Sequence, residues 1–207
     1  MHSTVVSLSD YTQPRQLATV FAVEGLSEPH LASGLRLRPA LDADADRIIG
    51  LVADIWSEYP GKVMGVQHDM PELLAPGRCY RECDGQFWLL DSAEGIVGTV
   101  AIKPGMTGEV MELENLYVRR SYRGQGLGTL LCSLVEQEAL CRRCTAIELW
   151  SDVEVLAAHR LYERLGYVRG SSIRSFDYTT AYYRKQLDPA RARDPARLAC
   201  LIREAFC

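Results

Sequence analysis

The chain has 207 residues, of which 47% are hydrophobic and 24% charged, and this balance is typical of one globular domain around a single core. Its net charge of −4 gives no broad positive field, which argues against nucleic acid and anionic lipid as partners. No run of about 18 apolar residues and no basic start followed by an apolar stretch occurs, so we expect a cytoplasmic protein with no membrane segment.

The residue composition and pattern of the N-terminal part of the chain change at Gly34. Residues 1–33 hold one short apolar run among prolines and glycines, and we expect them to be an extension. Leucines and arginines then alternate over 34–39, which predicts a strand with one exposed face. An apolar stripe over 48–55 predicts a helix. Residues 60–84 have few periodic positions and indicate a long loop with one helical turn, and such loops are often functional.

The middle of the chain predicts an antiparallel meander followed by alternating helices and strands. Strand patterns, separated by turns, cover 86–90, 96–103 and 110–118. A leucine stripe over 127–140 predicts a helix, and 146–150 reads as a strand.

The last part of the chain begins with Ser151 and Glu154, which have the spacing of a capping box and would open a helix that ends at Gly166. Strands over 167–169 and 179–187 complete a domain of residues 34–187. The 188–207 segment is expected to be a helical tail that packs on its own domain or on a second copy in a homodimer. The fold class is therefore α/β, with a mixed, mostly antiparallel sheet of six to seven strands and about four helices.

Three glycines at every second position, Gly124, Gly126 and Gly128, stand between a strand and a helix. Without Cβ atoms, their N–H groups can point in one direction, and the helix N-terminus adds partial positive charge. Arg123 can add a direct contact to an anion, so the turn suits a pyrophosphate. A P-loop would need a lysine before Thr129 and a dinucleotide fingerprint would need a third glycine there. A nucleotide-binding protein and a turn with no ligand remain the alternatives.

Seven cysteines, an odd number scattered along the chain, are typical of reduced thiols in a cytosol. Two close pairs, Cys79 with Cys83 and Cys141 with Cys144, could supply four zinc ligands. Small buried thiols at helix ends are more often ordinary packing residues, and we expect no metal.

The spacing RxxGxG, formed by Arg123, Gly126 and Gly128 after the strand ELENLYV, resembles the acyl-CoA pyrophosphate motif of the GNAT superfamily of N-acetyltransferases. The segment AHRLYERLGYVR, residues 158–169, is similar to the later helix of that superfamily with its LYE(K/R)LGF signature. The order of elements over 34–187 agrees as well. The resemblance implies a splayed pair of parallel strands, acetyl-CoA as cosubstrate, and direct acetyl transfer to a primary amine of a small molecule or peptide.

The resemblance also assigns cofactor contacts to the end of the strand and to the turn. The apolar positions of 110–118 change parity near Glu114 or Asn115, which predicts a bulge. In the superfamily such a bulge frees backbone groups for the pantetheine arm. The implied cofactor-binding residues are Leu116, Tyr117, Val118, Arg123, Gly124, Gln125, Gly126, Leu127, Gly128 and Thr129.

Catalysis needs a proton acceptor for the amine and a proton donor for the leaving thiolate. By resemblance Tyr162 is the general acid, and Glu112 or Glu114 is the general base. The residues alone leave open that Tyr162 only packs and that the glutamates are only solvated. Many superfamily members carry asparagine where this chain has Val155, so one side-chain contact to the arm is missing.

The acceptor site is expected in the loop over 58–81, whose acidic residues favour a cationic amine. Amino acids, small amines, antibiotics and peptide N-termini all remain open, because one fold serves many acceptors. The alternative to an enzyme is a non-catalytic acyl-CoA-binding regulatory module.

Overall fold

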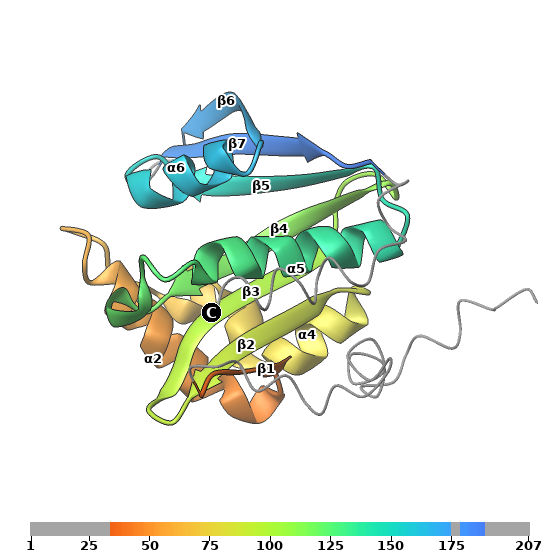
Figure 1. The fold of residues 1–207 in the computed structure, drawn as a ribbon. Coiled ribbons are helices and arrows are strands. Elements are labelled where there is room, and N and C mark those ends of the chain that lie inside the picture. Colours follow the sequence, from red (N-terminus) through yellow and green to blue (C-terminus); the bar gives the residue numbers. More distant parts are fainter. Residues whose placement is uncertain (1–33, 175–178, 189–207) are drawn as a thin grey trace, which may run out of the picture.

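A computed structural model of the protein describes residues 34–174 and 179–188 as one seven-stranded sheet with helices on both faces (Figure 1). The strands are β1 (Arg36–Pro39), β2 (Gln86–Ser92), β3 (Gly95–Pro104), β4 (Val110–Val118), β5 (Ala146–Asp152), β6 (Val168–Arg174) and β7 (Thr179–Gln186). The α-helices of the described residues are α2 (Ala45–Trp56), α3 (Val66–Asp69), α4 (Pro76–Glu82), α5 (Leu127–Cys141) and α6 (Leu156–Arg164). Single 3-10 turns are η2 (Asp42–Asp44), η3 (Pro71–Leu74) and η4 (Arg120–Tyr122).

The sheet is mixed and has the order β1-β2-β3-β4-β5-β7-β6. Strands β1 to β4 form an antiparallel meander, and β5 with β7 and β7 with β6 are antiparallel as well. Strands β4 and β5 are the parallel pair. The predicted α/β class and the mostly antiparallel sheet with one parallel pair are confirmed.

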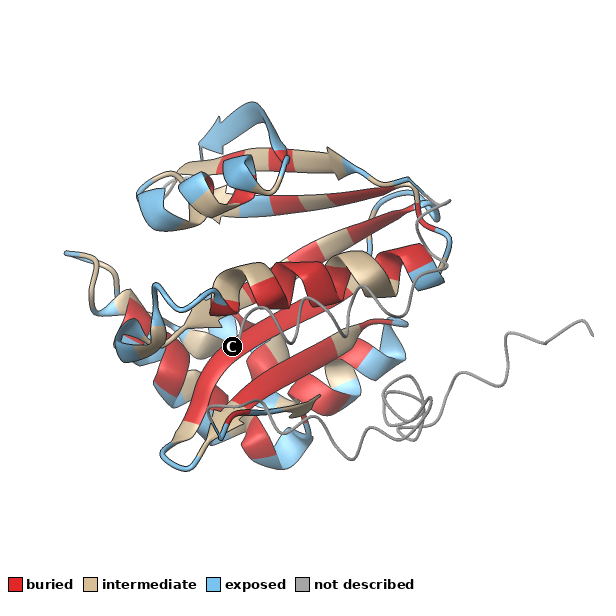
Figure 2. Ribbon diagram, viewed as in Figure 1, coloured by how far each residue is buried: buried red, intermediate tan, exposed pale blue. Residues whose placement is uncertain are grey.

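Two helical layers enclose the sheet, one on each face. Helices α5 and α6 pack against one face, where leucines of α5 and the ring of Tyr162 join side chains of β2 to β5 and β7. Figure 2 shows much of α5 and of the central strands in the colour of buried residues. Helix α2, η3 and α4 pack against the other face and cover mainly β2 and β3. In α2 the buried residues Ile48, Leu51, Val52 and Ile55 have the i, i+3, i+4, i+7 spacing of one helix face. Each such side chain stabilises the fold by roughly 1.5–3 kcal/mol when fully buried.

Residues 60–84 differ from the long loop that the sequence suggested. They contain α3, η3 and α4, and only the turn at η3 was expected. The helices have four and seven residues, too few to produce a recognisable period. They are held instead by tertiary packing, since Leu73 and Tyr80 are fully buried against α2 and β2.

The capping box predicted at Ser151 and Glu154 is wrong. Ser151 lies within β5, and α6 begins at Leu156 after Val155. The carboxylate of Asp152 instead accepts the N–H of Glu154 at 2.9 Å, in the turn between strand and helix. Gly166, with φ of +87°, ends α6 as predicted. The expected extension 1–33 and all but the first residue of the 188–207 tail lie outside the described residues.

Candidate active site

The parallel strands β4 and β5 pair only at their first residues and then diverge. The register runs from Val110 opposite Ala146 to Glu112 opposite Glu148 and stops there, although β4 continues to Val118 (Figure 1). The backbone groups of the second half of β4 that face β5 are therefore free of that ladder. This is the splayed pair that the family resemblance implied.

A bulge on the other side of β4 bends the strand at the same level. The register between β3 and β4 shifts between Thr99 and Ala101, which pair with Tyr117 and Glu114. Asn115 lies in the extra length, with φ of +53°, and its carbonyl accepts the Thr99 hydroxyl at 2.7 Å. The bulge predicted near Glu114 or Asn115 is confirmed.

The turn between β4 and α5 presents a row of unpaired backbone donors. Gly124 and Gly126 have φ of +79° and +80°, a left-handed conformation that favours glycine. In the described part of the chain, the N–H groups of residues 124–129 donate to no protein acceptor. They surround the N-terminus of α5, where the helix dipole attracts negative charge. The arrangement suits an anion.

Gly128 has a further role in packing. A Cβ atom at this position would lie 2.9 Å from Cδ2 of Leu161, so a small residue lets α5 approach α6 closely. Leu127, next to it, is buried and packs with Leu35 and Leu90 rather than facing the turn. The glycine pattern therefore positions a helix as well as a loop.

Arg123 is already engaged by protein groups. Its Nε donates to the carbonyl of Val118 at 2.8 Å, and its two terminal nitrogens donate to the two carboxylate oxygens of Glu58 at 2.6 and 2.9 Å. The guanidinium thus joins the turn to the end of α2. Sequence reasoning did not identify Glu58 as a partner, because the two residues are 65 positions apart.

Tyr162 lies on the buried face of α6, with only 5% of its surface exposed. Its ring packs at 5.8 Å from that of Tyr167 and 5.5 Å from that of Tyr183. Leu116 and Val118, from the second half of β4, pack on the same cluster. Burial raises the pKa of Tyr162 well above its ordinary value, so the phenol is protonated at neutral pH. It can therefore act as a proton donor.

Glu112 and Glu114 lie on the opposite face of β4 from Tyr162, because Met111 and Leu113 occupy the α5 face. Glu114 accepts the hydroxyl of Tyr80 at 2.9 Å and the ammonium of Lys103 at 2.6 Å.

Glu112 is held less tightly, since its carboxylate lies 3.6 Å from the Lys103 ammonium. Burial and the charge of Glu114 raise the pKa of Glu112, an effect that Lys103 opposes. Glu112 lies at the last residue pair of the parallel ladder, opposite Glu148, and Glu114 lies two residues beyond it.

Several neighbours of these glutamates were not predicted. Lys103 and Glu148 follow the strand alternation onto the same face as Glu112, and that parity could have revealed them. Tyr80 lies in the segment 58–81 expected to build the acceptor site, but its contact with Glu114 was not predicted. Asn115 donates to Tyr80 at 2.8 Å and to Glu72 at 3.2 Å, which links η3 and α4 to the bulge.

No group of three or more metal-ligating side chains is found within residues 34–174 and 179–188. The helices of this part of the chain are also too short or too polar to cross a membrane.

Residues 48–167, more than half of the chain, match the model of the Acetyltransferase (GNAT) family. The chain belongs to this family. N-acetylaspartate synthetase of Xenopus tropicalis is 33% identical over 92 residues, which are 44% of this chain and 31% of that protein. Human N-acetyltransferase 8B is 31% identical over 148 residues, 66% of this chain and 63% of the relative. The GNAT chain thus matches less than two thirds of the length of these relatives.

Solved structures agree with the GNAT fold. A GNAT-family acetyltransferase from Staphylococcus aureus Mu50 superimposes with a TM-score of 0.66 at 20% identity, covering 74% of this chain and 99% of that one. The protein yncA from Salmonella typhimurium, determined with its cofactor acetyl-CoA, gives 0.61 at 18% identity and covers 75% and 95%. At these identities the likeness establishes the fold.

Proposed function

We propose that this GNAT chain is an N-acetyltransferase that moves an acetyl group from acetyl-CoA directly to a primary amine of a small molecule or peptide. The observation that carries the proposal is the row of unpaired N–H groups over 124–129, placed where β4 leaves β5. Family membership and the acetyl-CoA of the Salmonella neighbour support it.

The residues present suit the parts of acetyl-CoA. The N–H groups of 124–129 and the helix dipole would hold the diphosphate, with Arg123 beside it. The free backbone of Leu116 to Val118 would accompany the pantetheine arm. The cosubstrate supplies an acetyl group activated as a thioester.

Glu112 and Glu114 of β4 and Tyr162 of α6 would then accept and donate the protons of the reaction. Glu112, with its raised pKa, would take a proton from the attacking amine. As the new C–N bond forms and the C–S bond breaks, Tyr162 would give its proton to the departing thiolate. Glu114, bound by Tyr80 and Lys103, is the weaker candidate for the base.

The acceptor is proposed to be a cationic amine. Four glutamates lie around the bulge and the first half of the parallel pair, where Lys103 and Arg184 are the cations that pair with them. The glutamates are Glu72, Glu112, Glu114 and Glu148. We also propose a cytoplasmic location, supported by the free thiols of the described cysteines. We also propose a homodimer formed through the 188–207 segment, and the molar mass measured by light scattering tests it.

The test measures thiol release from acetyl-CoA across a panel of amines. The wild-type protein should release thiol with at least one amine, and Tyr162→Phe should reduce kcat by about 10²-fold or more while leaving the fold intact. Tyr167→Phe is the matched control, because it removes the hydroxyl of the neighbouring buried ring and restores the residue usual in the family signature. Its rate should equal that of the wild type.

Two outcomes would contradict the enzyme. A thermal shift with acetyl-CoA but no thiol release with any amine would favour the acyl-CoA-binding module. Stabilisation by ATP or NAD and none by coenzyme A would favour a nucleotide-binding protein.

A further inference from the structure

Residues 57–62, which follow α2, form a short connection that we call the strap. Its backbone is built from turns, in which the N–H of Tyr59 donates to Trp56 at 3.0 Å and the N–H of Lys62 donates to Tyr59 at 3.1 Å. The indole N–H of Trp56 donates to the Tyr117 hydroxyl at 3.3 Å and fixes the start of the strap to β4.

One end of the strap is bound to the glycine turn. Glu58 accepts both terminal nitrogens of Arg123 in a bidentate pair, and the side chains are 22% and 35% exposed. Bidentate charge-assisted pairs are among the stronger polar contacts in proteins. The side of the guanidinium that carries its terminal nitrogens is thus turned to a carboxylate.

The other end of the strap is bound to the far side of the splayed pair. The ammonium of Lys62 pairs with Asp152, the last residue of β5, and lies 3.2 Å from the carboxylate of Glu154. Lys62 and Asp152 are 21% and 22% exposed, so the pair is partly shielded from solvent.

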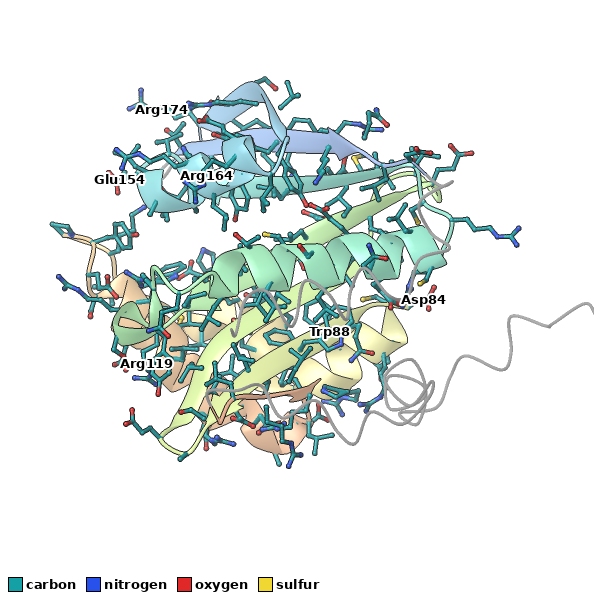
Figure 3. The ribbon with its side chains drawn as sticks, in the orientation of Figure 1. Asp84, Trp88, Arg119, Glu154, Arg164 and Arg174 are labelled. Atoms are coloured by element: carbon teal, nitrogen blue, oxygen red, sulfur yellow. The ribbon has the colours of Figure 1, made fainter. Side chains whose placement is uncertain are left out.

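The strap therefore connects the distal ends of β4 and β5, which no longer pair with each other. Figure 3 labels Arg119, just after β4, and Glu154, just before α6, on the two sides that the strap joins. Its two ion pairs replace the missing ladder at this end of the sheet.

We infer that Glu58 is an internal competitor for the diphosphate of acetyl-CoA at Arg123, and that acetyl-CoA binding releases this end of the strap. The inference rests on the proposed function. A carboxylate and a diphosphate cannot both receive the same guanidinium N–H groups, and two anions at such a distance repel each other. By linkage, whatever weakens the Glu58 contact must strengthen acetyl-CoA binding.

Titration calorimetry with acetyl-CoA tests the sign of this coupling. Glu58→Gln removes the competing charge at nearly constant shape, and its Kd should be about three- to tenfold lower than that of the wild type. Asp54→Asn is the matched control, because Asp54 lies four residues before Glu58, in the last turn of α2, and also faces an arginine, Arg119, at 3.6 Å. Its Kd should change less than about twofold.

A second variant and a second readout do not depend on Glu58→Gln. Lys62→Met frees the other end of the strap, lowers the effective concentration of Glu58 at Arg123, and should lower the Kd by about twofold. In the wild-type protein, amide hydrogen exchange over 57–62 should become faster when acetyl-CoA is added.

Each outcome has a defined meaning. A Kd that is unchanged or higher in Glu58→Gln would overturn the inference and make Glu58 a support for Arg123. An equal gain in Asp54→Asn, or slower exchange over 57–62, would overturn it as well. If the wild-type protein gives no heat with millimolar acetyl-CoA, the proposed function fails, and that result differs from a failure of the coupling alone.

Discussion

At the scale of single residues, Glu112 is distinguished by the charges around it. Burial and the carboxylates of Glu114 and Glu148 raise its pKa, while Lys103 opposes the rise. The folded protein therefore binds this proton more tightly than the unfolded chain does, and the stability linked to it is lost as the pH rises above the ordinary value of a glutamate. A general base works only when ionised, so the proposed reaction should speed up as the pH passes upward through this raised pKa.

A plot of kcat/KM against pH should therefore have a rising acidic limb set by the pKa of Glu112. Two substitutions should move this limb in opposite directions. Lys103→Met removes the charge that favours ionised Glu112, so the limb should shift to higher pH. Glu148→Gln removes a like charge and should shift it to lower pH. Glu82→Gln, an exposed change on α4, should leave the limb in place. Profiles measured with one amine check this, and a limb that ignores both changes would show that Glu112 is not the base.

The reach of sequence reasoning at this scale depends on how far apart the interacting residues are. Tyr162, Arg123 and the glycines could be named because each lies in a local motif. The partner of Arg123 could not, since Glu58 is 65 positions away and comes close only through the packing of α2. Lys103 and Glu112 share a face by strand parity, but only the register of β3 with β4 brings them together.

At the scale of elements, the glycine turn combines a constrained backbone with open space. A Cβ atom at Gly126 would meet no atom within 4 Å, yet its φ is +80°. Alanine there should cost about 1–2 kcal/mol from the backbone conformation and not from a clash. The strain can be relieved only by turning N–H groups of 124–129 away from their common direction.

Gly126→Ala should therefore weaken acetyl-CoA binding by about tenfold and lower the free energy of unfolding by about 1–2 kcal/mol. Gly108→Ala, in the turn between β3 and β4, also adds a Cβ to open space but without a positive φ, and should change neither quantity. Calorimetry and urea unfolding measure the two effects. A loss of stability with an unchanged Kd would mean that the turn does not hold the diphosphate.

Long and periodic elements were predictable, and short ones were not. The strands of the meander are apolar runs bounded by turns, and α5 has a leucine stripe at helical spacing. Their predicted ends agree with the structure within about two residues. The residues 66–82 fold into short helices because Leu73 and Tyr80 find a hydrophobic surface on α2 and β2. That surface exists only in the folded protein, so no local sequence pattern predicts these short helices.

At the scale of the whole molecule, two parts of the sheet meet along a short parallel seam. Only three residue pairs join β4 to β5, and α5 supports the seam through the ion pair of Glu136 with Lys185 of β7 at 2.7 Å. The main core cluster nevertheless includes side chains from both sides of the seam, from β2 to β4 and from β5 and β7. Folding should therefore be cooperative across the seam.

The same packing sets limits on the minimal domain, proposed as 34–187. Leu35, at its start, is 3% exposed, and Leu187, at its end, packs on the main core and donates its N–H to Thr145 at 2.7 Å. A chain of residues 34–187 should therefore unfold in one transition, with a Tm within about 2–4 °C of that of the full chain. Acetyl-CoA should raise both Tm values by the same amount.

A chain that starts at residue 40 is the contrasting case, because it lacks β1 and the buried Leu35. Strand β2 would then lose one of its two antiparallel partners and become an unprotected edge. Losing the buried Leu35 alone removes roughly 1.5–3 kcal/mol, so the Tm should fall clearly below that of 34–187. Equal Tm values for the two truncated chains, or a 34–187 chain that does not fold, would place the domain boundary elsewhere, because the packing of Leu35 and Leu187 would not then define it.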